Sequence, residues 1–234
     1  MKDLLESILA HIPHYLNSLG AVLSGPKAFF ANLDLESNNA LQDSLIFCAI
    51  SIALSAAATS LAVEADQDIY TIVAVLGLVG LLTLALTAFA LKISWRIVGG
   101  RASFRSTFVI YSYIYAVAAL VSSVFQIISV GAMRLLDNEA FKIFVEARKK
   151  GISIFNIPDH YPDLEISAGV ILANAILLFG FVFVLFWIIA TWGGFRYLNR
   201  LSRIKSFLAF MVFGLISIPL LAVTITMLNA FNLG

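Results

Sequence analysis

Five long apolar runs constrain this chain more than any other feature. None of them contains Asp, Glu, Lys, Arg or His. An α-helix needs about 20 mostly apolar residues to cross a hydrocarbon layer of about 30 Å, and each run meets that length. The runs lie at residues 44–63, 69–91, 107–130, 166–190 and 207–228. The sequence therefore predicts an all-α integral membrane protein with five transmembrane helices.

Composition and charge exclude several other classes of protein. The chain is 61% hydrophobic and only 12% charged, whereas about a quarter of the residues in a soluble domain are charged. The net charge of +1 argues against a nucleic-acid partner, because phosphate binding needs a strongly basic face. The single cysteine, Cys48, lies inside the first apolar run and allows neither an internal disulfide nor a thiolate metal site.

Two amphipathic segments lie outside the apolar runs. Residues 2–19 repeat apolar side chains at helical spacing, and Pro13 is expected to kink or split that helix. Residues 138–150 show a similar pattern. Asn39 and Asn138 are the expected helix caps. We therefore predict three parts: an interfacial cytoplasmic segment at 1–43, a membrane domain at 44–228, and within that domain an outer loop at 131–165 with its own interfacial helix.

Two basic turns, which we call the elbows, separate pairs of apolar runs. The first elbow is residues 92–105 and the second is residues 192–205, and each has four Lys or Arg residues and no acid. Each contains a tryptophan and a glycine pair: Trp95 with Gly99 and Gly100, and Trp192 with Gly193 and Gly194. Glycine allows a tight turn, and tryptophan is typical of the membrane–water boundary. Two explanations of the similarity are open. The elbows are an internal repeat of two helical hairpins, or the same residue types arose independently because both turns lie at the membrane–water boundary.

The distribution of positive charge predicts the orientation. Five spans place the N-terminal segment and both elbows on one side, which then carries ten lysines and arginines. The other side carries five, all in the outer loop, and that loop also carries six acids. Because positive residues accumulate on the cytoplasmic side of membrane proteins, we expect the N-terminus in the cytoplasm and the C-terminus outside.

Three short segments resemble those of the Yip1-domain family of membrane proteins. They are the segment Pro26-Lys-Ala-Phe-Phe30 ahead of the first span, the turn Gly99-Gly100-Arg-Ala-Ser-Phe104, and the start of the third span, Tyr111-Ser-Tyr113. The resemblance covers about residues 25–228. It implies a five-span plan with the N-terminus in the cytosol. The short N-terminal segment is similar to that of bacterial members, which implies a bacterial inner membrane.

No catalytic constellation, cofactor site or metal site stands out. Proton relays, ion-coupled pumps and intramembrane hydrolases place ionisable groups within the bilayer, and the five runs have none. His11 and His14 have helical ligand spacing, but Pro13 separates them and no third ligand is evident. An enzyme acting on lipid would need a site on the outer loop, such as His160 with Asp163. We therefore predict that the protein is not an enzyme.

Two functions remain after these exclusions. The first is a scaffold or adaptor that binds other membrane proteins or organises membrane lipids, with a homo-oligomer left open. Its predicted contact residues for lipid or partner are the elbow arginines: Arg96, Arg101, Arg105, Arg196, Arg200 and Arg203. Setting the topology alone is the other explanation of these arginines.

The second function is a channel or small-solute transporter with a weakly polar passage. Its predicted lining consists of Gln126, Asn174, Tyr111 and Tyr113. The simpler role for Gln126 and Asn174 is hydrogen bonding between helices, since a polar side chain in lipid needs a partner.

Overall fold

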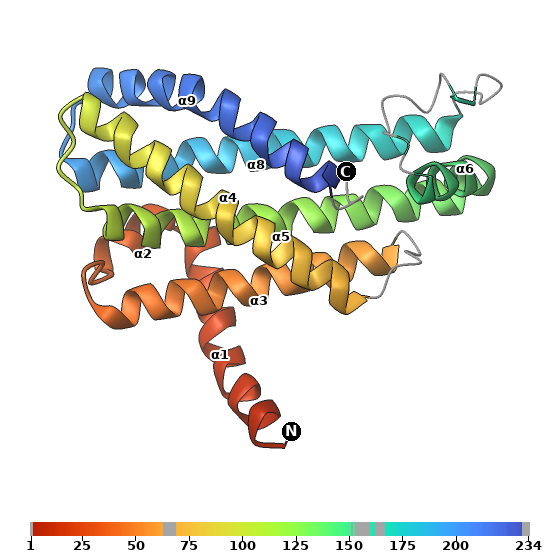
Figure 1. Cartoon of the computed structure of the whole chain (residues 1–234), viewed down its shortest axis with the longest axis horizontal. Helices are drawn as coiled ribbons and strands as arrows, with labels where there is room; N and C mark the ends of the chain where they lie inside the picture. The colour runs from red at the N-terminus through yellow and green to blue at the C-terminus, as the bar shows by residue number, and fades with distance from the viewer. Residues whose placement is uncertain (1, 63–68, 151, 153–159, 162–166, 231–234) are drawn as a thin grey trace.

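The computed structural model describes residues 2–62, 69–150, 152, 160–161 and 167–230, and within these residues it is all helical, with no strand. Figure 1 shows the arrangement. The helices are α1 (Lys2–Ser24), α2 (Pro26–Asn32), α3 (Asn38–Ala62), α4 (Ile69–Ile97), α5 (Phe104–Leu136), α6 (Asn138–Lys149), α8 (Ala168–Asn199) and α9 (Arg203–Ala230).

Five of these helices, α3, α4, α5, α8 and α9, are long and apolar enough to cross a membrane. The predicted all-α class with five transmembrane helices is confirmed. Helix α5 packs against α3, α8 and α4, whereas α9 packs mainly against α4. Figure 1 shows both elbows at one end of the bundle, with α6 near the other. We call the end of the bundle that contains both elbows the elbow end.

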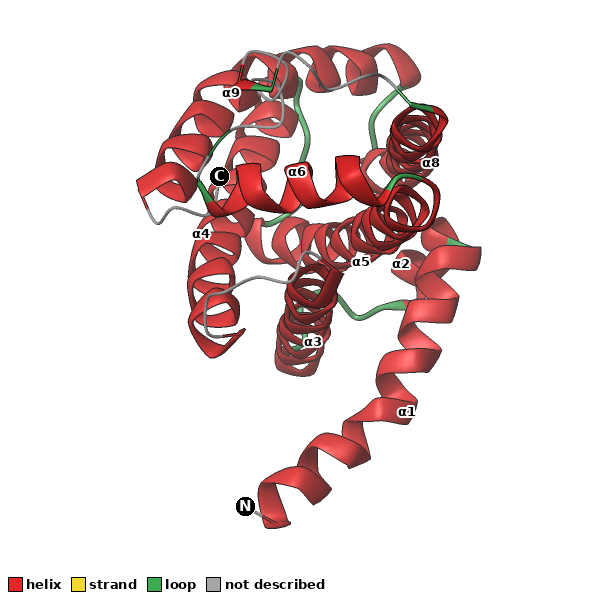
Figure 2. Ribbon diagram, turned by 90° about the vertical axis from the view of Figure 1, so that its right-hand side faces the viewer, coloured by secondary structure: helices red, strands yellow, loops and turns green. Residues whose placement is uncertain are grey.

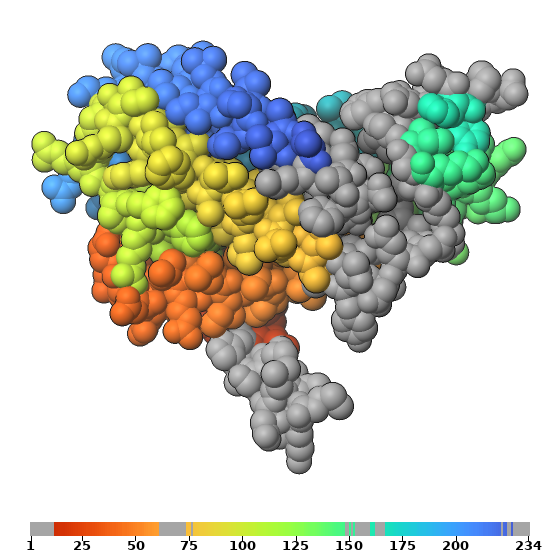
Figure 3. All heavy atoms as spheres, in the orientation of Figure 1, coloured from red at the N-terminus to blue at the C-terminus, as the bar shows by residue number. Residues whose placement is uncertain are grey.

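The outer surfaces of the spanning helices are apolar. Helices α3, α4 and α9 form one broad face (Figure 3), and α6 crosses the bundle at the end opposite the elbows (Figure 2). Large exposed side chains include Leu54 on α3, Phe186 on α8 and Leu215 on α9. A surface of this kind suits acyl chains rather than water.

Helix α1 is one α-helix from Lys2 to Ser24 with Pro13 inside it, so the expected split at Pro13 is wrong, and the expected kink stays a prediction. The proline lacks an N–H and leaves one carbonyl of the preceding turn without its usual donor. Pro13 itself is exposed.

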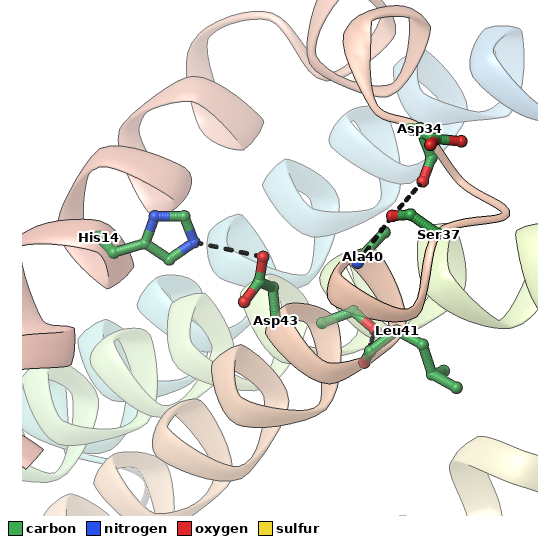
Figure 4. A network of polar contacts seen from close by, with 7 residues as sticks. His14, Asp34, Ser37, Ala40, Leu41 and Asp43 are labelled. Atoms are coloured by element: carbon green, nitrogen blue, oxygen red, sulfur yellow. Dashed lines mark hydrogen bonds and ion pairs between the residues drawn. The ribbon is translucent and has the colours of Figure 1, made fainter. Parts of the chain in front are cut away.

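The helix caps lie one or two residues before the asparagines that were expected to form them. Ser37 Oγ accepts a hydrogen bond from Ala40 N at 3.1 Å at the start of α3 (Figure 4). Asp137 Oδ1 accepts one from Ala140 N at 2.9 Å at the start of α6. In both places a side-chain oxygen meets the amide three residues ahead, which is the geometry that an N-cap requires. The division of the chain at residues 43 and 44 stays a prediction.

Candidate functional site

The two elbows are held together by one buried side chain, Asn199, which is 2% exposed. Its Oδ1 accepts a hydrogen bond from Ala102 N at 3.2 Å, and its Nδ2 donates to Phe195 O at 3.0 Å. The amide thus joins residues 97 apart in sequence. Sequence reasoning missed Asn199, because a single asparagine in a basic turn carries no signal of its tertiary partner.

Both elbows turn by the same backbone motif. In the first elbow Gly99 has a φ of +93°, Gly99 N donates to Arg96 O, and Gly100 N donates to Trp95 O. In the second elbow Arg200 has a φ of 52°, its N donates to Tyr197 O, and the next amide returns to Arg196 O. These pairs of bonds define a Schellman motif, which closes a helix with one residue in the left-handed region.

The two glycine pairs are therefore not equivalent. Gly193 and Gly194 lie inside α8, and the chain turns only at Arg200. Gly194 instead allows α2 to approach α8, since a Cβ added to it would lie 3.3 Å from the Phe30 ring. The expected turn at this pair is wrong because both glycines remain within the hydrogen-bonded helix, which extends to Asn199.

Trp95 does not mark a lipid-facing boundary. It is 1% exposed, and its ring lies 4.8 Å from that of Trp192 and 6.2 Å from that of Phe195. Trp192 Nε1 donates to Ser206 Oγ at 2.9 Å. The aromatic side chains of the two elbows thus pack on each other and form a rigid base for the arginines around them.

The left-handed conformation of Arg200 leads to a stability prediction. This conformation costs a non-glycine residue roughly 1–2 kcal/mol, so Arg200→Gly is expected to raise the free energy of unfolding by about 0.5–1 kcal/mol after the added chain entropy of glycine. The readout is thermal unfolding followed by dye labelling of Cys48, the single, buried cysteine. Arg203→Gly removes the same charge at the first residue of α9 and should give no gain.

A second contact, which we call the Glu36 clasp, ties the first elbow to the start of α3. Ser103 Oγ donates to Glu36 Oε1 at 2.6 Å, and Arg105 Nη2 donates to Ser37 O at 2.8 Å and to Asn38 Oδ1 at 2.6 Å. The serine hydroxyl bonds, with a smaller contribution from the Arg105 charge, lower the pKa of Glu36 below its ordinary value. Sequence reasoning did not single out Glu36.

The clasp makes the stability of this end depend on pH. A carboxyl with a depressed pKa in the folded state stabilises the fold above its ordinary pKa of 4.5, and this stabilisation is lost as the pH falls through the depressed value. Glu36→Gln is therefore expected to lower the unfolding temperature at neutral pH. The difference from the wild type should shrink well below pH 4.5. An equal difference at both pH values would contradict this role of Glu36.

The elbow arginines fall into two groups. Arg105 is engaged in the Glu36 clasp. The others are what we call the unpaired arginines, because none of them makes a side-chain hydrogen bond or an ion pair with any residue that the structure describes. They are Arg96, Arg101, Arg196, Arg200 and Arg203, of which Arg196 is half-buried and the rest are exposed. The elbow end thus presents guanidinium groups that keep their hydrogen-bonding capacity for a ligand.

The predicted intramembrane polar residues do not share one lining. Gln126 Oε1 accepts a long hydrogen bond from Thr59 Oγ1, at 3.4 Å, and links α5 to α3. Asn174 is exposed on α8, and its Nδ2 donates to Val170 O one turn earlier in the same helix. Gln126 thus makes a contact between helices, whereas the Asn174 side chain bonds to the backbone of its own helix.

The tyrosines belong to the packed core near the elbow end. Tyr113 is 1% exposed, and its ring lies 5.0 Å from that of Phe29, 6.3 Å from that of Phe30 and 4.9 Å from that of Phe47. Tyr111 is half-buried, with its ring 6.2 Å from that of Tyr115. The segment ahead of the first span and the tyrosine segment thus meet in one aromatic cluster.

No metal site is evident in the part of the chain that the structure describes. That part contains no group of three or more His, Cys, Asp or Glu side chains placed to hold a metal ion. His14 lies on α1, with its Nε2 3.9 Å from Asp43 Oδ2. Asp159 and Asp163, which the sequence places beside His160, lie outside the described residues.

Comparison with known families supports the resemblance. The family model of the Yip1 domain matches residues 20–225, which is most of the chain. No curated protein and no solved structure gives a significant match. The matched region takes in α2, both elbows, four of the spanning helices in full and most of α9. The chain is therefore an integral membrane protein of the Yip1-domain family.

Proposed function

We propose that this protein is a non-enzymatic membrane scaffold or adaptor whose elbow end binds anionic lipid headgroups and thereby organises lipid and neighbouring membrane proteins. The unpaired arginines carry this proposal. A guanidinium binds a phosphate through two parallel N–H donors, and each basic residue near an anionic membrane contributes about 1 kcal/mol. In this proposal the elbow end is cytoplasmic, the C-terminus lies outside, and the membrane is a bacterial inner membrane.

The rigidity of the elbow end supports a binding role. The buried Asn199 amide, the ring contact between Trp95 and Trp192, and the Glu36 clasp hold both elbows in one arrangement. Groups that are ordered before binding lose less conformational entropy when a ligand arrives. The contacts of Gln126 and Asn174 support a packed bundle rather than the alternative, a channel or small-solute transporter.

The proposal is tested by removing unpaired arginines while leaving Arg105 in place. Arg101→Gln combined with Arg203→Gln removes two charges, which at about 1 kcal/mol each corresponds to roughly 30-fold weaker binding of anionic lipid at low salt. The measurement is the amount of phosphatidylglycerol that co-purifies with the full chain, determined by mass spectrometry. A topology reporter at the C-terminus verifies that the double variant inserts as the wild type does.

Arg105→Gln is the control in which positive charge is removed from an arginine that is already engaged. It removes one positive charge and breaks the Glu36 clasp, so we expect a lower unfolding temperature and little change in retained lipid. If the double variant keeps all of its phosphatidylglycerol with its insertion intact, the arginines serve topology alone and the lipid-binding proposal is wrong.

A further inference from the structure

Helix α1 crosses the spanning helices rather than running along them, as Figures 1 and 2 show. Between residues 12 and 24 it has one stripe that faces the bundle. That stripe consists of Tyr15, Ser18 and Val22, which are 6%, 7% and 0% exposed. The spacing of three and four residues places these side chains on one side of a helix.

Two exposed stripes of different character flank the buried one. The first, which we call the apolar stripe, is Ile12, Leu16 and Leu23, which are 39%, 56% and 38% exposed. The second, which we call the polar stripe, is His14, Asn17 and Ser24, all exposed. At about 100° per residue, the two stripes lie on opposite sides of the buried one. A helix with three such sides has one side for the protein, one for an apolar medium and one for a polar medium.

Two contacts with α3 show which exposed stripe faces which way. His14 Nε2 lies 3.9 Å from Asp43 Oδ2 (Figure 4), and the Tyr15 hydroxyl forms a 3.0 Å hydrogen bond with Ser51 Oγ. Asp43 lies nearer the elbow end, eight residues or about 12 Å along α3 from Ser51. His14 belongs to the polar stripe, and Tyr15 is the residue of the buried stripe that lies nearest the apolar stripe. The polar stripe therefore faces the elbow end, and the apolar stripe faces the middle of the span.

The position along α3 matches the edge of the hydrocarbon layer. Asp43 is the last charged residue of α3, and no charged residue follows it through Ala62. Leu54, further along the same helix, is 50% exposed. The apolar stripe therefore faces away from the elbow end, toward the uncharged part of α3 whose apolar surface faces lipid.

We propose that residues 12–24 of α1 lie half-submerged in the leaflet at the elbow end, with the apolar stripe bound to phospholipid acyl chains and the polar stripe at the headgroups. The occupant of the apolar stripe is lipid, because the stripe is exposed and points toward the middle of a transmembrane span. Residues 12–24 contain no Lys or Arg, so apolar burial rather than charge holds the helix in place. This contact is independent of the unpaired arginines.

The test uses neighbouring residues on opposite stripes as matched probes. In a Cys48→Ala background, single cysteines at Leu16→Cys and Asn17→Cys carry a spin label, and the full chain is reconstituted in phospholipid vesicles. Oxygen concentrates in the acyl layer and a nickel chelate stays in water. We expect the ratio of oxygen to nickel-chelate collisions to be several-fold higher at position 16 than at position 17.

A second pair, Leu23→Cys and Ser24→Cys, repeats the comparison if the first pair does not fold. Equal access of the nickel chelate to both stripes would show α1 lifted into water and would overturn the proposal. A label at position 16 that is shielded from both reagents and broadened by a neighbouring label would show a second copy on the stripe, which also overturns it. Molar salt should leave the ratio unchanged, whereas it screens arginine–lipid contacts, so this proposal and the proposed function can fail separately.

Discussion

Gly100→Ala is expected to break the joint between the two elbows. A Cβ at this position would lie 2.5 Å from Asn199 Oδ1 and 2.7 Å from Trp95 O. The Trp95 carbonyl accepts the bond from Gly100 N that closes the turn, and the Asn199 amide accepts from Ala102 N. Neither atom can move without losing a hydrogen bond in a buried place. We expect a loss of about 1–3 kcal/mol from the overlap alone.

The same readout, thermal unfolding followed by labelling of Cys48, measures this loss. Gly193→Ala is the matched control, because a Cβ there meets no atom within 4 Å. Alanine is favoured over glycine inside a helix by about 1 kcal/mol, so this variant should unfold at or above the wild-type temperature. If the two alanine variants unfold at the same temperature, Gly100 is not the contact that the structure shows.

Gly180→Ala is expected to have a comparably large effect at the contact between α5 and α8. A Cβ there would lie 2.4 Å from Phe125 Cγ and 2.6 Å from Phe125 Cβ. Because the Cβ of Phe125 is fixed to its backbone, a rotamer change cannot relieve the overlap and the two helices must separate. The expected loss is again about 1–3 kcal/mol, read from the same labelling of Cys48.

A double variant identifies the contact responsible. Phe125→Gly removes both the Cβ and the ring that a methyl group at position 180 would meet, so adding Gly180→Ala to it should cost much less than adding Gly180→Ala to the wild type. Gly214→Ala on α9 is the control, since a Cβ there meets no atom within 4 Å. Additive losses in the double variant would contradict packing of Phe125 on Gly180.

The elbows illustrate how far sequence reasoning reaches. A run of basic residues without acids at the end of an apolar span is visible directly, and both elbows lie where that pattern put them. The position of the second turn was not predictable, because a glycine pair is compatible with both a turn and a helix interior. The chain turns at Arg200 instead, where α8 ends and its last carbonyls take the bonds of a Schellman motif.

The candidate site shows the same division. The six arginines were predicted as one set because they share charge and position in the chain. The Glu36 clasp separates Arg105 from the other five, through contacts with residues 67 and 68 positions away in sequence. Likewise Trp95 was expected at a membrane boundary, as tryptophans often are, but it is buried against the second elbow.

By itself the sequence determined the all-α class and the five spans, because transfer of an apolar run into a bilayer depends on the composition of that run alone. It also determined the family, because the short segments that carry the resemblance are read directly along the chain. Only the tertiary structure decided which polar groups meet across the elbows, which arginines stay unpaired, and how α1 is rotated about its axis. Those outcomes depend on contacts between residues far apart in the chain, such as Asn199 with Ala102 and Tyr15 with Ser51, and no local pattern encodes them.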